Sequence, residues 1–568
     1  MDEHGSPAGH EGSDGAAASA GGSSRRDRLR SAVSARLGAD RRALAAFRVA
    51  IGVVLLVDLA LRARNLTAFY TDAGVLPRSV LAESYPLFAQ FSLHALSGGS
   101  RLVVLLFVLA GVAAVALAVG YRTRLALAVS LALLASLQAR NPFVLNAGDT
   151  LLWQLLGAGL LCPLGARWSV DAVRHESVDA ARRESVDAAD DAVGSRPAGD
   201  RFVSPASALL LAVVVVVYVS NAVAKLRGTA WPAGEAVGRV FELTYLHGPL
   251  GGLVPEAPAL LAAATYGWLA LLLAAPLLVL AAGRLRTALA GTLVLAHLSM
   301  AFTLQIGVFP LVSAAGLLPF LPSPVWDRVE RGVEPVRVRL RERIRRRHDS
   351  SPPDGGPGVD GDSSADSDSS ADSDSSADTG SGVDTDPAGD RLAVVDLGRR
   401  VAPFVAAVLL VSLLAWNGMA IGVVATPEPV AAVSDPAESG WDMFAPSPPS
   451  TDALVLATAT AADGGAEAGR PTDPDRIDAL YGDPVAADRS PSDARRYPTA
   501  RWRKFLTLLS ASPDAARVDP LLAHLCDRAD GFTDGGIESV TVSFVDVDVT
   551  APSHPRVEEL GTRECGVP

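Results

Sequence analysis

The stretch PASALLLAVVVVVYVSNAVAK at residues 205–225 decides the fold. Its side chains are almost all Leu, Val and Ala, and no charged residue precedes Lys225 at its end. An α-helix needs ~20 consecutive, mostly apolar residues to cross the hydrocarbon core of a bilayer. A run of this length and composition therefore predicts a helix that spans a membrane.

Eight further runs have the same character, and together they predict an all-α polytopic membrane protein with about nine transmembrane helices. The composition agrees, because 49% of the residues are hydrophobic, only 20% are charged and the mean hydropathy is +0.27. The nine predicted spans cover residues 44–62, 101–120, 124–139, 149–165, 205–225, 257–282, 285–305, 308–322 and 401–424.

Polar segments divide the chain into regions. Acidic, Ser-rich repeats occur in two of them and cannot bury a core, so they are typical of solvated linkers. The predicted regions are a disordered cytoplasmic tail at 1–40, a transmembrane domain of about eight helices at 41–322 with a cytoplasmic low-complexity loop at 166–204, an Arg-rich and then Asp/Ser-rich cytoplasmic linker at 323–400, the ninth span at 401–424 and an extracytoplasmic domain at 425–568.

The orientation follows from arginine, which supplies nearly all the basic residues and concentrates in short connections on one side of the predicted bundle. Cytoplasmic loops are enriched in Arg and Lys. This places the N-terminus in the cytoplasm and residues 425–568 outside a cell membrane. That last segment predicts a small α+β domain, with a helix near 498–510 and a strand at 540–547, where apolar and polar residues alternate.

The three cysteines have no metal-ligand spacing. Cys526 and Cys565 share the C-terminal segment, so a disulfide between them is expected if that segment faces an oxidising exterior. The net charge of −12 belongs to tails and loops. We expect the lipid bilayer, and no nucleic acid, as the main partner, and no nucleotide-binding, metal or hydrolase motif is present.

Charged residues at membrane depth need an explanation, because each costs about 2.5–3.5 kcal/mol on insertion scales. Arg48 and Asp58 lie in the first predicted span, about 15 Å apart along a helix with ~1.5 Å rise per residue, so they cannot pair directly. Each must find a partner on another span or reach an interface. The alternative is that Arg48 extends to the inner surface and Asp58 caps the outer end. Asp149, at the start of the fourth span, suits a helix N-terminus.

Tyr218, Asn221 and Lys225 are three and four residues apart, which places them on one face of the fifth span. A desolvated lysine there can serve as a general base that Asn221 orients. The alternative is an interfacial lysine at a helix end. In the seventh span, His297 and Gln305 are either site residues or groups that bond neighbouring helices.

The sequence resembles the vitamin K-dependent γ-carboxylase-like proteins, also called horizontally transferred transmembrane (HTTM) domain proteins. The resemblance covers roughly residues 41–322, and WDMFAP at 441–446 is similar to the segment that follows this domain in many prokaryotic members. The motifs are FRVAIGVVLLVD at 47–58, FYTDAGVLPR at 69–78, GYRTRLAL at 120–127, WSVDA at 168–172, KLRGTAWPAG at 225–234 and HLSMAFTLQIGVF at 297–309.

This resemblance implies a lysine base that deprotonates a menaquinone- or vitamin K-type quinol near the outer surface. Lys225 matches the base and His297 matches a histidine before I-G-x-F, while Asn221, Trp231 and Asp149 are expected to line the pocket. The carboxylase has a histidine at the start of the fourth span, where this chain reads NAGD at 146–149. That departure argues against glutamate carboxylation.

Three functions remain open from the sequence. The first is a membrane enzyme linked to a naphthoquinone, with Lys225 as base. The second is a non-catalytic scaffold, lipid-binding protein or transporter in which the polar residues only hold helices together. In the third, the exterior domain is the functional part and binds a protein partner.

Overall fold

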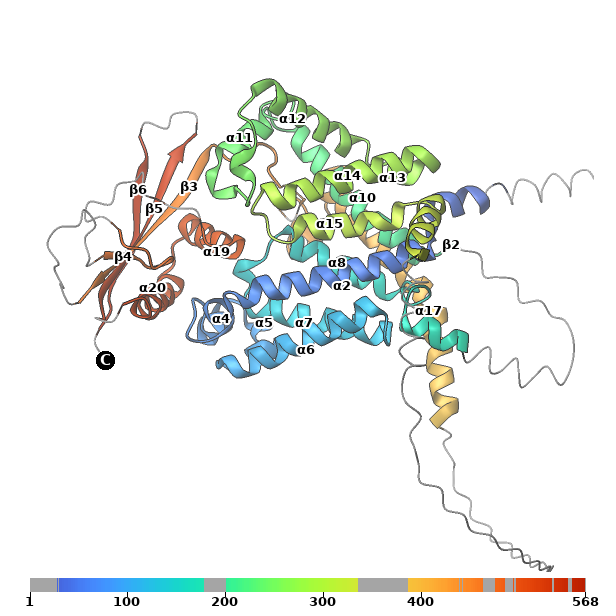
Figure 1. The fold of residues 1–568 in the computed structure, drawn as a ribbon, viewed down its shortest axis with the longest axis horizontal. Coiled ribbons are helices and arrows are strands. Elements are labelled where there is room, and N and C mark those ends of the chain that lie inside the picture. Colours follow the sequence, from blue (N-terminus) through green and yellow to red (C-terminus); the bar gives the residue numbers. More distant parts are fainter. Residues whose placement is uncertain are drawn as a thin grey trace, which may run out of the picture. The chain divides into compact units, whose positions relative to one another are not determined.

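The computed structural model describes residues 28, 30–177, 201–335, 387–438, 440–441, 443–462, 476–485, 494, 497–533, 536–549 and 554–566, with 387–399 in backbone only (Figure 1). Most of the predicted tail, the low-complexity loop and the acidic linker lie outside these residues. The described residues up to Ser323 and from Pro403 belong to one compact unit, and those within Pro324–Ala402 to a second.

Each predicted span coincides with a helix or a pair of helices (Figure 1). The helices are α2 (Arg41–Ala63), α6 (Ser100–Val119), α7 (Thr123–Arg140), α8 (Ala147–Leu160), α10 (Pro205–Leu226), α12 (Pro258–Leu273) with α13 (Leu277–Leu280), α14 (Gly283–Thr303), α15 (Phe309–Leu317) and α17 (Pro387–Ala420).

Several of these helices are shorter than the sequence predicts. α8 and α12 have 14 and 16 residues and α15 has nine, against the ~20 that a straight span needs. The prediction of a helical protein with several apolar spans is confirmed, whereas nine spans are not. Five described helices are long and apolar enough to cross a membrane: Arg41–Ala63, Ser100–Val119, Pro205–Leu226, Gly283–Thr303 and Arg400–Ala420. The number is six if Phe309–Phe320 and Ser323–Pro335 form one broken span.

Side-chain caps fix where the main helices begin. The Asp40 carboxylate accepts a hydrogen bond from the first turn of α2. Asn146 and Asp149 form a reciprocal capping box at the start of α8. Ser204 caps α10, and Pro205 follows in the first helical position, where its missing N–H costs nothing. These caps set the register that places the polar residues described below.

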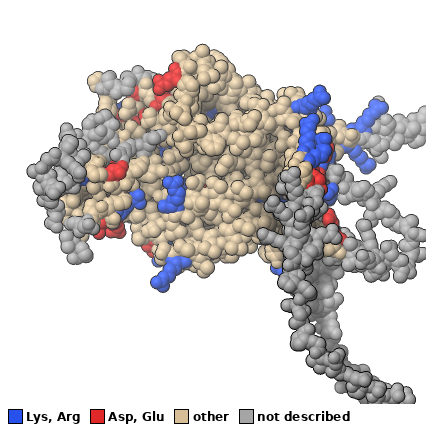
Figure 2. Space-filling model, viewed as in Figure 1, with Lys and Arg blue, Asp and Glu red and all other residues tan. Residues whose placement is uncertain are grey.

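The helices pack in a chain of neighbours in which α2 contacts α6 and α15, α7 contacts α6 and α8, and α10 contacts α8, α12 and α15 (Figure 1). The outer face of α6 is apolar, with Leu105, Val108 and Val112 all exposed. Figure 2 shows a broad face of the bundle with few charged side chains. Such a surface suits lipid and not water.

Short elements connect the helices. They are β1 (Ala39–Asp40), paired antiparallel with β2 (Arg201–Phe202), then α3 (Leu66–Tyr70), α4 (Arg78–Ser84), α5 (Pro86–Phe91), η1 (Leu93–Ala95), η2 (Pro142–Val144), α11 (Ala236–Glu242), η3 (Thr244–Leu246), η4 (Gly251–Leu253), η5 (Leu318–Phe320) and α18 (Glu428–Ala431).

The C-terminal domain is a four-stranded antiparallel sheet in the order β4-β3-β5-β6, with helix α20 against β5 and β6. Its elements are β3 (Thr451–Ala461), β4 (Arg476–Asp478), α19 (Ala500–Ala511), α20 (Ala515–Asp530), β5 (Ile537–Asp548) and β6 (Arg556–Glu564). The predicted strand at 540–547 lies within β5, where Val540 and Val542 are buried. The prediction of a small domain with helices and a sheet is therefore confirmed.

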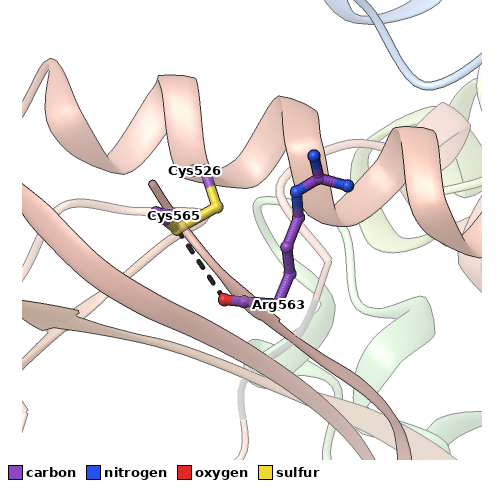
Figure 3. Close-up of a disulfide and its surroundings, with 3 residues drawn as sticks. All are labelled: Cys526, Arg563 and Cys565. Carbon is purple, nitrogen blue, oxygen red and sulfur yellow. Dashed lines mark hydrogen bonds between the residues drawn. A yellow bond between two sulfur atoms is a disulfide. The ribbon is translucent and has the colours of Figure 1, made fainter. Parts of the chain in front are cut away.

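A disulfide joins Cys526 on α20 to Cys565, just after β6 (Figure 3). The two Cα atoms are 5.6 Å apart and the sequence separation is 39 residues. A disulfide that closes a loop of this size contributes about 4 kcal/mol to the free energy of unfolding in the chain-entropy model. The bridge therefore fastens the helix to the outer strand of the sheet.

Candidate functional site

The three polar residues predicted on one face of α10 do lie together. Lys225 sits in the last turn of the helix, but its side chain is buried, with 2% of its surface exposed. Its Nζ donates to the Asn221 Oδ1 at 2.6 Å, one turn earlier. Lys225 is therefore at a helix end, as expected of an interfacial lysine, but its side chain is buried and does not extend into water.

Two further groups surround the ammonium. Trp231, in the turn after α10, presents its ring 4.3 Å from the Lys225 Nζ, a cation–π distance. The backbone carbonyl of Met443 accepts a second hydrogen bond from the Nζ. Oxygen atoms and a ring face all favour the charged form of the amine, so in this arrangement Lys225 is a hydrogen-bond donor.

His297 lies on α14, fully buried. Its Nδ1 is 2.8 Å from the Leu293 carbonyl of its own helix. Because a carbonyl only accepts, Nδ1 carries a proton, which leaves Nε2 as an acceptor in the neutral ring. Nε2 has no hydrogen-bond partner among the described residues. In this structure His297 therefore does not bond a neighbouring helix.

The hydroxyl of Tyr218 is a second buried polar atom without a partner in the described part of the chain. The Tyr218 and His297 ring centroids are 5.8 Å apart, and Trp268 and Phe309 lie at 5.5 and 6.0 Å from the histidine ring. A buried hydroxyl or ring nitrogen left unpaired costs about 1–3 kcal/mol. Two such atoms side by side need an explanation.

These residues meet in one cavity of about 320 Å³ with a mainly apolar lining. Helices α10, α11, α12 and α14, the segment that leads into α15 and the segment after α18 form its walls. The predicted site residues among its lining are Tyr218, Asn221, Lys225, Trp231 and His297, and they are joined by apolar or aromatic residues that include Val217, Phe241, Trp268, Leu271, Met300, Phe309 and Phe444.

The other predicted site residues lie elsewhere. Arg48 is buried at the opposite end of α2 from Asp58 and donates to the carbonyls of Leu164, Arg167 and Trp168. It is therefore held by a loop and does not extend into water. Gln305 lines a second cavity, of about 430 Å³, which also reaches Asp58. Asp149 is in neither cavity lining, although the sequence predicts it beside Lys225.

Asp58 and Asp149 belong to a buried ion cluster. The Arg62 guanidinium donates to Asp58 at 2.6 Å and also to Asp149. Arg501, from α19 of the C-terminal domain, donates to Asp58 at 2.7 Å and lies 3.4 Å from Asp149. Two guanidinium groups thus balance two carboxylates with all four side chains buried.

Sequence reasoning missed Arg62 and Arg501. The four-residue spacing from Asp58 to Arg62 on one helix was a signal for their pairing. Nothing local marks Arg501, because its partner Asp58 is 443 positions away.

Two more contacts fix the C-terminal domain to the bundle. The Trp502 indole N–H donates to the Asn65 Oδ1 at 3.1 Å. His524 on α20 contacts the Ala73 carbonyl through Nδ1 at 2.9 Å. Burial lowers the pKa of His524, which favours the neutral form of its ring.

The arrangement is chemically suited to an apolar molecule with polar atoms at its edges. Lys225 supplies a cationic donor, the Tyr218 hydroxyl a donor or acceptor, and the His297 Nε2 an acceptor. The described residues contain no group of three or more His, Cys, Asp or Glu that could hold a metal ion.

The apolar spans and the polar residues enclosed between them define a multi-span helical membrane protein. Residues 38–326, half of the chain, match the family model of the HTTM domain. The chain therefore belongs to the HTTM domain family. No curated protein and no solved structure matches it.

Proposed function

We propose that the HTTM domain of this chain binds a membrane-soluble naphthoquinone or naphthoquinol in the 320 Å³ cavity. The observation that carries the proposal is the pair of buried polar atoms without a partner among the described residues, the Tyr218 hydroxyl and the His297 Nε2, in a mainly apolar lining. A naphthoquinol satisfies both atoms, because one hydroxyl donates to the His297 Nε2 and the other pairs with the Tyr218 hydroxyl, while its rings fill the apolar space. A naphthoquinone carbonyl only accepts, so of these two atoms it pairs with the Tyr218 hydroxyl alone. The volume falls in the usual range of ligand pockets, about 300–1,000 Å³.

Lys225 is the group that gives this cavity a chemical function beyond binding. Its ammonium donates to a ligand oxygen, and in the neutral form it takes a proton from a quinol hydroxyl, as the γ-carboxylase-like resemblance implies. The base function requires loss of the Met443 contact, which favours the protonated amine. Glutamate carboxylation is not part of the proposal, because Asp149 is engaged with Arg62 and Arg501.

The test is binding of 2-methyl-1,4-naphthoquinone to the purified full-length protein, measured by equilibrium dialysis. Gly267 lines the cavity on α12, and a Cβ there meets nothing within 4 Å, so Gly267→Phe should fill the space and abolish binding. Gly291→Phe is the matched control, since Gly291 is also helical with open space at its Cβ but is not in the lining. Equal binding by both variants and the wild type would place the ligand elsewhere.

A lipid-binding protein without catalysis is the second candidate. It is favoured by the contacts of Lys225, whose hydrogen bonds to Asn221 and Met443 stabilise the charged amine without any ligand. In that case a lipid chain occupies the cavity, and the same dialysis with the naphthoquinone shows no saturable binding.

The proposal includes a topology of nine spans in the cell membrane, with the N-terminus and residues 323–400 in the cytoplasm and 425–568 outside. Support comes from the arginine-rich connections and from the contacts of the C-terminal domain with the end of α2 and the start of α8. Single-cysteine labelling of intact cells in a background without native cysteines tests it. Labelling by an impermeant reagent at position 370 but not at 480 would reverse the orientation.

A further inference from the structure

The cavity is bordered by a short segment that lies outside the HTTM domain. We call Trp441 and residues 443–446 the strap; they follow helices α17 and α18 in the chain. Three strap carbonyls accept hydrogen bonds from three residues of the cavity lining: Trp441 from the Asn221 Nδ2 at 3.0 Å, Met443 from the Lys225 Nζ, and Phe444 from the Trp231 Nε1 at 2.8 Å. Every polar lining residue at this end of α10 is thus tied to the strap.

The strap is also held closely against the turn that follows α10. A Cβ added at Gly228 would lie 1.9 Å from the Pro446 carbonyl oxygen, so only glycine permits this approach. The chain just after α17, which leads to the strap, is held against the end of α10. Arg227, which directly follows α10, donates to the Ile421 carbonyl at 2.6 Å.

The side chains of the strap complete the cavity wall. Met443 and Phe444 both line it, although the family match ends at residue 326. About 320 Å³ remains open with the strap in place, so the strap forms part of the cavity wall without filling the cavity. The HTTM domain by itself therefore lacks one wall of its own site.

We propose that the strap is the closing wall of the ligand site: Met443 and Phe444 determine which ring compounds fit, and release of the strap carbonyls lets the ligand enter and leave. This rests on the proposed function for the nature of the ligand but not for the closure itself. When the strap is released, the Lys225 Nζ loses its hydrogen bond to the Met443 carbonyl.

The closure is tested first without any ligand. Val217 lines the cavity and is buried, so Val217→Cys in a Cys162→Ala background places one free thiol inside. We expect slow modification by methyl methanethiosulfonate in the full-length protein. Adding Gly228→Ala should displace the strap and speed labelling about tenfold or more, the effect of losing one or two net hydrogen bonds.

Gly291→Ala is the control, because its Cβ meets open space and it lies outside the cavity lining. Trp231→Phe is a milder second variant that removes the donor to the Phe444 carbonyl and keeps an aromatic ring at this position. Unchanged labelling in both Gly228→Ala and Trp231→Phe, or rapid labelling of the protein with its strap intact, overturns the proposal.

The second measurement is the dissociation rate of 2-methyl-1,4-naphthoquinone from the same proteins. Faster dissociation from Gly228→Ala and Trp231→Phe, with Gly291→Ala unchanged, is the expected result. If the labelling result holds but no variant and no wild-type protein binds the naphthoquinone, the closing wall stands and the ligand assignment fails. If the naphthoquinone binds and its dissociation is the same in all variants, the strap is not the route of exchange.

Discussion

Replacing Arg501 by methionine removes one of two guanidinium groups from the buried ion cluster and leaves the cluster with a net negative charge. Asp58 and Asp149 then share Arg62 alone, inside a site with almost no solvent exposure. Breaking a buried ion pair by removing one partner costs about 3–5 kcal/mol, because the remaining charge stays desolvated. Because Arg501 lies on α19, its loss should lower the free energy of local opening of α19.

Hydrogen exchange of the α19 amides in purified protein measures that opening. At about 1.4 kcal/mol per factor of ten, exchange should accelerate roughly 100- to 4,000-fold in Arg501→Met. Arg239→Met is the control, because the Arg239–Glu235 pair is exposed and worth under about 1 kcal/mol. The double variant Asp58→Asn/Arg501→Met, which restores neutrality, should recover part of the loss. Exchange within about threefold of wild type in Arg501→Met would show that the ion cluster does not hold α19 in place.

Three further predictions concern Lys225, the disulfide and His524. Lys225→Arg should abolish complementation of a deletion strain at normal protein abundance, because a guanidinium cannot give up its proton; full complementation removes any base role. Reducing the Cys526–Cys565 bridge should destabilise the C-terminal domain by about 4 kcal/mol in chemical denaturation, and recovery of both as free thiols after alkylation in situ would reject the bridge. The pKa of His524 is lower in the folded state, so the unfolded state binds more protons and stability should fall as pH drops below about 6.5. His524→Gln should lose this dependence in a pH series of denaturation curves. An unchanged dependence in the variant would assign it to another group.

The sequence allowed the class of fold to be predicted because apolar runs and strand alternation are local patterns. The lengths of α8, α12 and α15 were not predictable in the same way. Continuous hydropathy hides the points where these helices end, such as the break at Pro276 between α12 and α13. A short apolar helix buried between longer ones has the same composition as a span.

Helical spacing alone predicts that Tyr218, Asn221 and Lys225 share one face, because all three lie on the single helix α10. The position of His297 beside them depended on the family resemblance. Asp149 was expected beside Lys225 but lies in the ion cluster with Arg501, because a residue from the C-terminal domain takes it as a partner. The strap contacts, such as that between Asn221 and Trp441 over 220 positions, leave no local trace in the sequence.

The central claim is that the cavity beside Lys225 and His297 holds a naphthoquinone-type molecule. Its most direct test is lipid extraction and mass spectrometry of the full-length protein purified from its own membranes, with Gly267→Phe purified in parallel. We expect a naphthoquinone close to one per chain in the wild type and its loss in the variant. Phospholipid alone in both extracts, with no ring compound retained by the wild type, would contradict it.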